Sequence, residues 1–344
     1  MTRLFCTLAA TVLLSVPALA QTLLEGGRLE SPVLGRFWDP QAKAMRSVNG
    51  VPGASSASAP TGVEALRYAA SAPHRNWAIV DRADAGSLET MTFGRTGATL
   101  RGFEAARGVD QIAFSPSGDA AILYWRGARA EVWKNFSTTP ERAASYSLDG
   151  VEGDVRSLAV ADDASVAALI VDAGDKAQLF SLTGSMNKVG TADGWSAVAF
   201  APGTRVAFVA NRETSEISQF SNFGSDSTSS VVASSTDGVV SPSAIAISSD
   251  GRKLVVANQD DPSVAVIELD TRRSTVLTLE RAADGFYALE GNAVFRLSAS
   301  PKPEIFLLDA DGADARISAV AIPAAEIAQP TDSKATTVAA KGGK

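Results

Sequence analysis

The chain has 344 residues, of which 45 % are apolar, and it carries a formal charge of −7 at neutral pH. This negative charge would repel phosphate backbones, so the composition argues against a nucleic-acid partner. Cys6 is the only cysteine, which excludes an intrachain disulfide and a cluster of thiolate metal ligands.

The first twenty residues have the pattern of a secretory signal peptide. Arg3 gives a short positive segment, residues 4–16 form an uncharged apolar run, and residues 18–20 (Ala-Leu-Ala) match the small residues at a signal-peptidase site. The apolar run is shorter than the roughly 20 residues of a membrane span. We therefore predict a cleaved leader at residues 1–20, export to the periplasm or the extracellular space, and no transmembrane span in the mature chain. Cleavage also removes Cys6 and leaves 30 basic and 38 acidic residues, a formal charge of −8.

Two short apolar segments after the leader predict a β-hairpin. Residues 32–38 and 44–48 have the composition of strands, and residues 39–43 between them begin with the turn-forming pair Asp39-Pro40. Residues 49–62 are rich in Gly, Ser, Ala and Pro and predict a connecting loop.

A repeating unit dominates the chain from about residue 60 onward. Each copy begins with a short apolar strand that has a small residue at its centre, followed by a Gly/Ser/Asp/Pro turn and further strands; these central residues are Ala69, Ala113, Ala159, Ala199, Ala246 and Ala288. Their mean spacing of about 44 residues is typical of one four-stranded propeller blade. The period predicts an all-β fold, a single β-propeller over residues 21–328. Length favours seven four-stranded blades, with six blades as the alternative because six copies are visible.

Two of these copies carry motifs of known propellers. Residues 252–269 (RKLVVANQDDPSVAVIEL) resemble the YVTN repeat, in which a strand ending in Thr-Asn or Ala-Asn leads through a polar loop into a Val-rich strand. Residues 204–212 are a looser copy. Residues 113–119 (AFSPSGD) are similar to the Phe-Ser-Pro-Asp-Gly turn of WD-repeat-like and Tol-system propellers, with Ser117 in place of Asp. The resemblance covers residues 60–323 and implies a fold rather than an activity.

The two ends of the chain are expected to close the ring. A closed propeller has no free sheet edges, and closure usually combines strands from both ends of the chain in one blade. The hairpin at residues 32–48 therefore predicts the third and fourth strands of a composite seventh blade, joined by strands from residues 317–327. Residues 221–235 are Ser-rich and predict an extended surface turn. Residues 329–344 have no apolar period and predict a disordered tail.

Acidic residues are frequent in the loops that this topology places on one rim of the propeller, which we call the top rim. The top rim holds the loops before first strands and the loops between second and third strands. The candidate binding residues in them are Asp110, Asp154, Asp193, Asp284, Asp172, Asp260 and Asp261. Clustered carboxylates at a channel mouth would attract a cation or a basic partner. The alternative is that Asp is simply a frequent turn residue beside Gly.

Residues 309–314 (DADGAD) contain spaced carboxylates of the kind that bind calcium. The Gly stands at the fourth position rather than the sixth, and no Glu follows at the EF-hand position, so an ordinary turn between a third and a fourth strand is favoured. The identity of any bound metal stays open, and no cofactor is expected.

His74, the only histidine, is the candidate general acid or base. It lies in residues 71–75, a turn between a first and a second strand, on the rim opposite the acidic one, and no Gly-x-Ser-x-Gly motif accompanies it. The sequence therefore predicts a surface histidine and a non-catalytic binding, scaffolding or protein-interaction module, monomeric, with a protein or an envelope polymer as its partner. Lactonases share the propeller shape, so a lactonase-like or other propeller hydrolase is the alternative.

Overall fold

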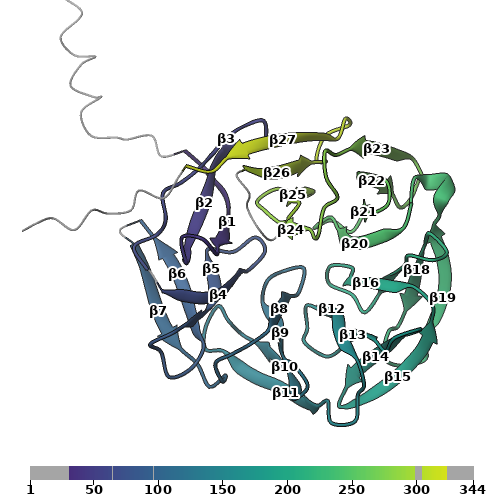
Figure 1. Ribbon diagram of the computed structural model, residues 1–344, viewed down its shortest axis with the longest axis horizontal. Coiled ribbons are helices and arrows are strands. Elements are labelled where there is room, and N and C mark those ends of the chain that lie inside the picture. Colours follow the sequence, from purple (N-terminus) through teal and green to yellow (C-terminus); the bar gives the residue numbers. More distant parts are fainter. Residues whose placement is uncertain (1–30, 64, 96, 299–303, 324–344) are drawn as a thin grey trace, which may run out of the picture. The chain divides into compact units, whose positions relative to one another are not determined.

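The computed structural model describes residues 31–63, 65–95, 97–298 and 304–323. The chain divides into a short N-terminal unit, Met1–Pro32, and a second unit, Val33–Lys344, which contains all of the described strands. The second unit is a β-propeller of seven antiparallel sheets that follow one another in a ring (Figure 1). Residues from the first strand of each sheet line a central channel. Within the described ranges the only helical element is a 3-10 turn, Ser235–Asp237. The predicted all-β class, the single propeller and the count of seven blades are confirmed.

The blades are numbered here in chain order. Blade 1 has three strands, β1 (Val33–Asp39), β2 (Ala44–Val51) and β3 (Ala54–Ala57). Blade 2 contains β4 (Leu66–Ser71), β5 (Trp77–Arg82), β6 (Glu89–Gly94) and β7 (Gly97–Gly102), and blade 3 contains β8 (Gln111–Phe114), β9 (Ala120–Trp125), β10 (Arg129–Lys134) and β11 (Glu141–Ser147). Blade 4 contains β12 (Asp154–Val160), β13 (Ala167–Asp172), β14 (Ala177–Thr183) and β15 (Ser185–Ala192).

The remaining three blades also have four strands each. Blade 5 contains β16 (Trp195–Phe200), β17 (Ala207–Asn211), β18 (Glu216–Ser221) and β19 (Thr228–Ala233). Blade 6 contains β20 (Pro242–Ile247), β21 (Lys253–Asn258), β22 (Ser263–Glu268) and β23 (Ser274–Thr278). Blade 7 contains β24 (Tyr287–Ala288), β25 (Val294–Arg296), β26 (Glu304–Asp309) and β27 (Arg316–Ala321). In every blade the first strand lies next to the channel (Figure 1).

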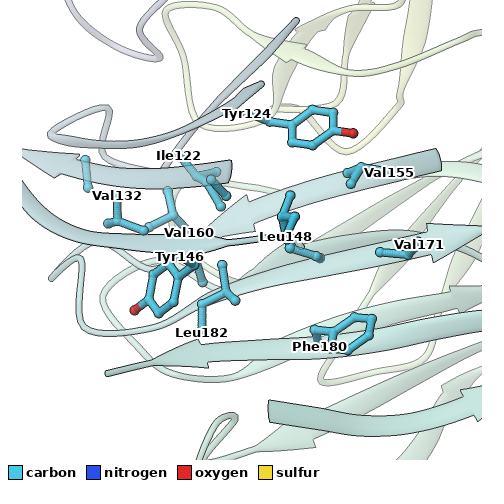
Figure 2. Packing of buried hydrophobic residues seen from close by; sticks show 14 residues of the cluster. Ile122, Tyr124, Val132, Tyr146, Leu148, Val155, Val160, Val171, Phe180 and Leu182 are labelled. Carbon is cyan, nitrogen blue, oxygen red and sulfur yellow. The ribbon is translucent and has the colours of Figure 1, made fainter. Parts of the chain in front are cut away.

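The core lies between neighbouring blades, which explains why the middle strands are continuous apolar runs. Both faces of such a strand pack against another sheet, so alternation of polar and apolar residues is lost. All six residues of β9 are buried, for example. Figure 2 shows one interface, in which Ile122 and Val132 of blade 3 lie in one cluster with Val160 and Leu182 of blade 4.

Two loops expected from the sequence contain strands instead. Residues 49–62 include the end of β2 and all of β3, and residues 221–235 include β19. Both β3 and β19 are third or fourth strands near the outside of a blade, where most side chains face solvent. An exposed strand does not need apolar residues, so Ser-rich sequence is compatible with it.

Ring closure differs from the predicted composite blade. The hairpin of β1 and β2 supplies the first and second strands of blade 1, not third and fourth strands, and it pairs with β3. Strand β27 pairs with β26 in blade 7. The composite-blade prediction is therefore wrong for the described residues. Its remainder at residues 324–327 lies outside them, as do the predicted leader at 1–20 and the predicted tail at 329–344.

Blade 1 joins the two ends of the ring by side-chain packing. Its residues Leu34, Phe37 and Val48 pack against Ile305 and Val320 of blade 7. On its other face Met45 packs with Leu66 and Met91 of blade 2, among others. The backbone N–H of Glu290 in blade 7 also donates to the carbonyl of Leu34 at 2.6 Å. Apolar interfaces on both faces thus close the ring.

A buried ion pair stabilises blade 1 from within. The Nε atom of Arg46 lies 2.7 Å from Oδ2 of Asp39, and both side chains are almost completely buried. Arg46 also donates from Nη1 to the carbonyl of Ser58 at 2.9 Å, and the backbone N–H of Thr61 donates to the carbonyl of Met45. These bonds tie the segment after β3 to the first two strands.

No helix of the described ranges is both long enough and apolar enough to span a membrane.

Candidate functional site

The central channel contains a cavity of about 520 Å³, within the range that small-molecule sites usually have. The first strands of all seven blades line it, from β1 around to β24. The cavity also reaches the turns between first and second strands, which form the bottom rim, because Pro73, Ser115, Ser249 and Asn292 contribute to its wall.

Polar side chains link the first strands of blades 3 to 6 by hydrogen bonds. Gln111 in β8 donates to the carbonyl of Val155 in β12 at 3.1 Å. The Ser157 hydroxyl in β12 accepts from the N–H of Val198 in β16 at 3.1 Å. Ser196 in β16 donates to the carbonyl of Pro242 in β20 at 2.6 Å. Backbone groups at the inner edges of the sheets, which have no further strand to pair with, are satisfied in this way.

The titratable residues that line the cavity all come from blades 1, 2 and 7. They are Arg36, Tyr68, His74, Tyr287 and Arg296. None of the described residues in the cavity wall is Asp or Glu. This part of the wall is therefore cationic at neutral pH.

Arg296 is a buried cation beside the cavity. Its guanidinium lies 4.3 Å from the centre of the Tyr287 ring and 5.6 Å from that of Phe37, and it donates to the carbonyl of Ser298. Burial lowers the pKa of Arg296 to about 10, while Tyr287 and Asp284 act in the opposite direction. Burial raises the pKa of Tyr287 to about 12, against the pull of Arg296. At neutral pH the arginine is therefore charged and the phenol is neutral.

Arg36 in β1 supplies a second cation to the same wall. Its guanidinium lies 4.2 Å from the centre of the Phe93 ring, which orients it by a cation–π contact. Burial lowers the pKa of Arg36, and the carboxylate of Glu290 opposes that shift. Burial also raises the pKa of Tyr68, whose ring meets Trp38 edge-on at 5.7 Å. Arg36 therefore stays charged beside a neutral phenol.

His74 lies in the turn between β4 and β5, as the sequence predicts, but it lines the channel rather than the outer surface. Its backbone φ of 53° falls in the left-handed region, where His is one of the enriched residue types. Burial lowers the pKa of His74; the carboxylates of Glu290 and Asp311 oppose the shift, and Arg75 adds to it. The imidazole is therefore neutral at neutral pH and can accept a proton.

Five of the predicted acidic residues lie in the expected loops, whereas Asp154 is the first residue of β12 and Asp172 the last of β13; none of the seven lines the cavity. Several are close to arginines: Oδ2 of Asp110 accepts from the backbone N–H of Arg126 at 2.8 Å, Asp154 lies 3.7 Å from the Arg126 guanidinium, and Asp172 pairs with Arg156. Asp193 and Asp284 precede β16 and β24, and Asp260 and Asp261 lie between β21 and β22. Their role as a binding surface stays a prediction.

Asp260 lines a second, polar cavity of about 400 Å³ together with Arg212 and Glu213. In the described part of the chain, no three His, Cys, Asp or Glu side chains are grouped so that they could hold a metal ion. In the motif at residues 309–314, Asp309 ends β26, and residues 310–315 connect β26 to β27. In this connection the Asp311 carboxylate accepts from the backbone N–H groups of Asn292 and Ala293. The connection joins the third and fourth strands of blade 7, the place where the sequence predicts a turn.

The cationic wall is the feature that sequence reasoning missed. Arg296, the last residue of β25, interrupts the otherwise apolar segment of residues 293–297 (AVFRL), and a charged residue in a buried segment is a recognisable signal. Arg36 gives a weaker signal, since Arg is common on strand surfaces.

Comparisons with known proteins agree with this fold. A family model described as "Lactonase, 7-bladed beta-propeller" matches residues 162–287, less than half of the chain. A search of curated proteins finds no match. The partial family match favours the lactonase-like alternative over the non-catalytic interaction module that the sequence analysis preferred; the YVTN resemblance receives no separate support.

Solved structures with a similar fold include three that align with most of this chain. Hydrazine synthase of Kuenenia stuttgartiensis is 11% identical over 86% of this chain and 98% of its own, with a TM-score of 0.50. A protein from Bacteroides uniformis ATCC 8492, described as a "putative 6-phosphogluconolactonase", is 11% identical over 83% and 94%, with a TM-score of 0.54. A functionally unknown protein from Desulfotomaculum acetoxidans DSM 771 is 10% identical over 84% and 99%, with a TM-score of 0.55. At these identities the likeness concerns the fold alone.

Proposed function

We propose that the central channel is the active site of a lactonase-like hydrolase in which His74 is the general base. The observation that carries the proposal is that the only imidazole of the chain, with a lowered pKa, lines the same cavity as Arg36 and Arg296. The partial match to the lactonase family model supports the same activity class.

The reaction uses one water and leaves the base unchanged. His74 takes a proton from water as the water oxygen attacks the lactone carbonyl, which forms a tetrahedral oxyanion. The acyl C–O bond of the ring then breaks, and the protonated imidazole returns its proton to the departing alkoxide. The product is an open-chain hydroxy acid. A neutral imidazole is required at the start, and burial of His74 favours that form.

The two arginines supply the electrostatic part of the mechanism. The guanidinium groups of Arg36 and Arg296 place positive charge in a wall that has no described carboxylate. Positive charge beside the carbonyl stabilises the oxyanion more than the neutral lactone, which lowers the barrier. The contacts with Phe93 and Tyr287 hold these groups in position before substrate arrives.

The test is hydrolysis of a panel of γ- and δ-lactones by the tag-free mature protein, followed by pH-stat titration of the acid released. We expect turnover that the His74→Ala variant reduces by a factor of about 10²–10⁴, the usual contribution of a general base. Arg205→Ala, at an exposed position far along the chain in blade 5, is the control and should keep the wild-type rate. Equal rates for wild type and His74→Ala, or no turnover of any lactone, would overturn the proposal.

Ligand binding without turnover is the second candidate. It is favoured by the channel wall itself, whose described residues include no carboxylate to orient His74. In that case the same lactones, or their hydroxy acids, bind and are released unchanged. Saturable binding with no acid release separates this candidate from the hydrolase.

A further inference from the structure

We infer that the ligand of the channel is an amphiphile, with an anionic head at the wall of blades 1, 2 and 7 and a hydrocarbon chain along blades 3 to 6. This inference names the ligand class for the site described above, and as a statement about substrate it rests on the proposed function. Its evidence is the unequal division of the cavity wall between polar and apolar residues.

The first strands of blades 3 to 6 contribute only residues with hydrocarbon side chains to the cavity wall, and six of these twelve side chains are buried between neighbouring blades. Each strand contributes three consecutive lining residues, at 112–114 (Ile-Ala-Phe), 158–160 (Leu-Ala-Val), 198–200 (Val-Ala-Phe) and 245–247 (Ile-Ala-Ile). The middle residue is alanine in all four. Small residues at equivalent positions leave a wall with room beside it, where an extended chain can lie.

The remaining wall has the opposite character. Arg36 and Arg296 bring two positive charges from blades 1 and 7, and Tyr68 and Tyr287 add phenol groups that can donate hydrogen bonds. The Arg296 guanidinium is stacked on Tyr287 at 4.3 Å, which restricts its orientation. A carboxylate bound here would be attracted by both guanidinium groups, in addition to Glu290 and Asp284, which already act on Arg36 and Arg296 respectively.

A polyhydroxylated ligand fits this division poorly. Hydroxyl groups around a sugar ring would find few side-chain partners on the side of blades 3 to 6, where Ser115 and Ser249 are the polar side chains of the described wall. A methylene chain loses nothing on that side, and each buried methylene should tighten binding about fourfold. The cavity therefore selects for an alkyl carboxylate, or an alkyl-substituted lactone that yields one.

The experiment measures the binding of simple probes to the tag-free mature protein by calorimetry, at concentrations below those at which the probes form micelles. We expect affinity to rise about fourfold per methylene from hexanoate to octanoate to decanoate. Gluconate, which has the carboxylate without the chain, and decanol, which has the chain without the carboxylate, should each bind at least tenfold more weakly than decanoate. Affinity independent of chain length, or tighter binding of gluconate, would overturn the inference.

Two variants test the two halves of the site separately. Arg36→Met should weaken all carboxylates by a similar factor and leave decanol binding unchanged. Ala199→Phe, which fills part of the apolar wall, should weaken decanoate more than hexanoate. Arg205→Met is the matched control and should bind like wild type. If both channel variants bind decanoate with wild-type affinity, decanoate binds elsewhere and the inference fails. If a variant does not fold, the comparison of the probes on the wild-type protein decides.

These outcomes separate the ligand class from the hydrolase activity. Binding that depends on chain length without lactone turnover supports the ligand class and contradicts the hydrolase. Turnover of unsubstituted and alkyl-substituted lactones at equal kcat/KM supports the hydrolase and contradicts the ligand class.

Discussion

The imidazole of His74 is influenced by two carboxylates and a guanidinium that act on its pKa in opposite directions. Burial is the largest effect and lowers the pKa, whereas Glu290 and Asp311 raise it. The acid form of His74 is therefore disfavoured in the folded protein, and its pKa lies below that of an unperturbed histidine. A base of this kind works over the neutral range and is lost in acid.

Replacing Glu290 by Gln should lower the pKa of His74 further, because it removes a carboxylate that stabilises the imidazolium. The activity of the wild type should fall as the pH drops through the pKa of His74, and in Glu290→Gln this fall should occur at lower pH. Since His74 is the only histidine, its ring C2–H signal in a tag-free protein reports the same pKa by NMR without any substrate.

A matched control for this change is Glu213→Gln in the loop between β17 and β18. This variant should leave the pKa of His74 unchanged. A higher pKa in Glu290→Gln than in the wild type would contradict the electrostatic account. It would mean that Glu290 affects His74 mainly through structure or hydration.

At the scale of the strand, the repeat pattern predicted the buried inner and middle strands of the blades and missed the exposed outer strands. The central alanines of the first strands were recognised because they recur at equivalent positions about 44 residues apart. β9 and most of β21 are apolar because both faces of a middle strand pack against a neighbouring blade. Strands β3 and β19 had no such signal, because side chains near the outer edge of a blade face water.

Asn258, the Asn of the YVTN-like segment, connects three parts of blade 6. It is fully buried at the end of β21. Its Oδ1 accepts from the backbone N–H of Val240, and its Nδ2 donates to the carbonyl of Gly238 and to the Ser263 hydroxyl, all at 2.9 Å. This amide therefore holds the loop before β20 against the start of β22.

Asn258→Ala should lower the free energy of unfolding by about 1–3 kcal/mol or more, because it leaves backbone groups of residues 238 and 240 without these partners. Asn211→Ala is the natural comparison, since its Oδ1 accepts only from the N–H groups of Glu213 and Thr214 in an exposed turn. That change should cost less. Urea unfolding monitored by fluorescence measures the free energy of unfolding of both variants. Equal losses would show that the buried hydrogen bonds of Asn258 contribute no more to stability than the exposed ones of Asn211.

At the scale of the molecule, the closure of the ring depends on blade 1. Closure by strands from both ends of the chain was a reasonable expectation, but β1 lies beside the channel and carries apolar residues that pack on blade 7. The sequence could not assign the hairpin to inner strands, because its turn and strand lengths fit either pair of a blade. Only the tertiary structure, in which Leu34 and Phe37 pack between blades 1 and 7, assigned the hairpin to the inner strands.

Deleting residues 33–57, which keeps the predicted leader and its cleavage site, should abolish the cooperative fold. The deletion exposes the faces of blades 2 and 7 and removes Leu34, Phe37, Met45 and Val48, all buried. At about 1.5–3 kcal/mol for each side chain, the loss of about 6–12 kcal/mol approaches the whole stability of a typical domain. Size-exclusion chromatography and thermal melting measure the result. A monomer that melts at the wild-type temperature would show that the other six blades close without blade 1.

The sequence by itself determined the class of fold, the size of a blade and the position of His74 in a turn between first and second strands. These properties are local: a blade is made of antiparallel strands joined by short turns, so its period, its turn residues and its buried strands lie within about 44 consecutive residues. The tertiary structure alone decided the chemistry of the channel. Arg36, Tyr68 and Arg296 come from opposite ends of the chain and meet only because the ring closes, and the arginines beside the acidic loops are likewise brought there by folding. Charge and burial at a site depend on neighbours in space, which a pattern along the chain does not contain.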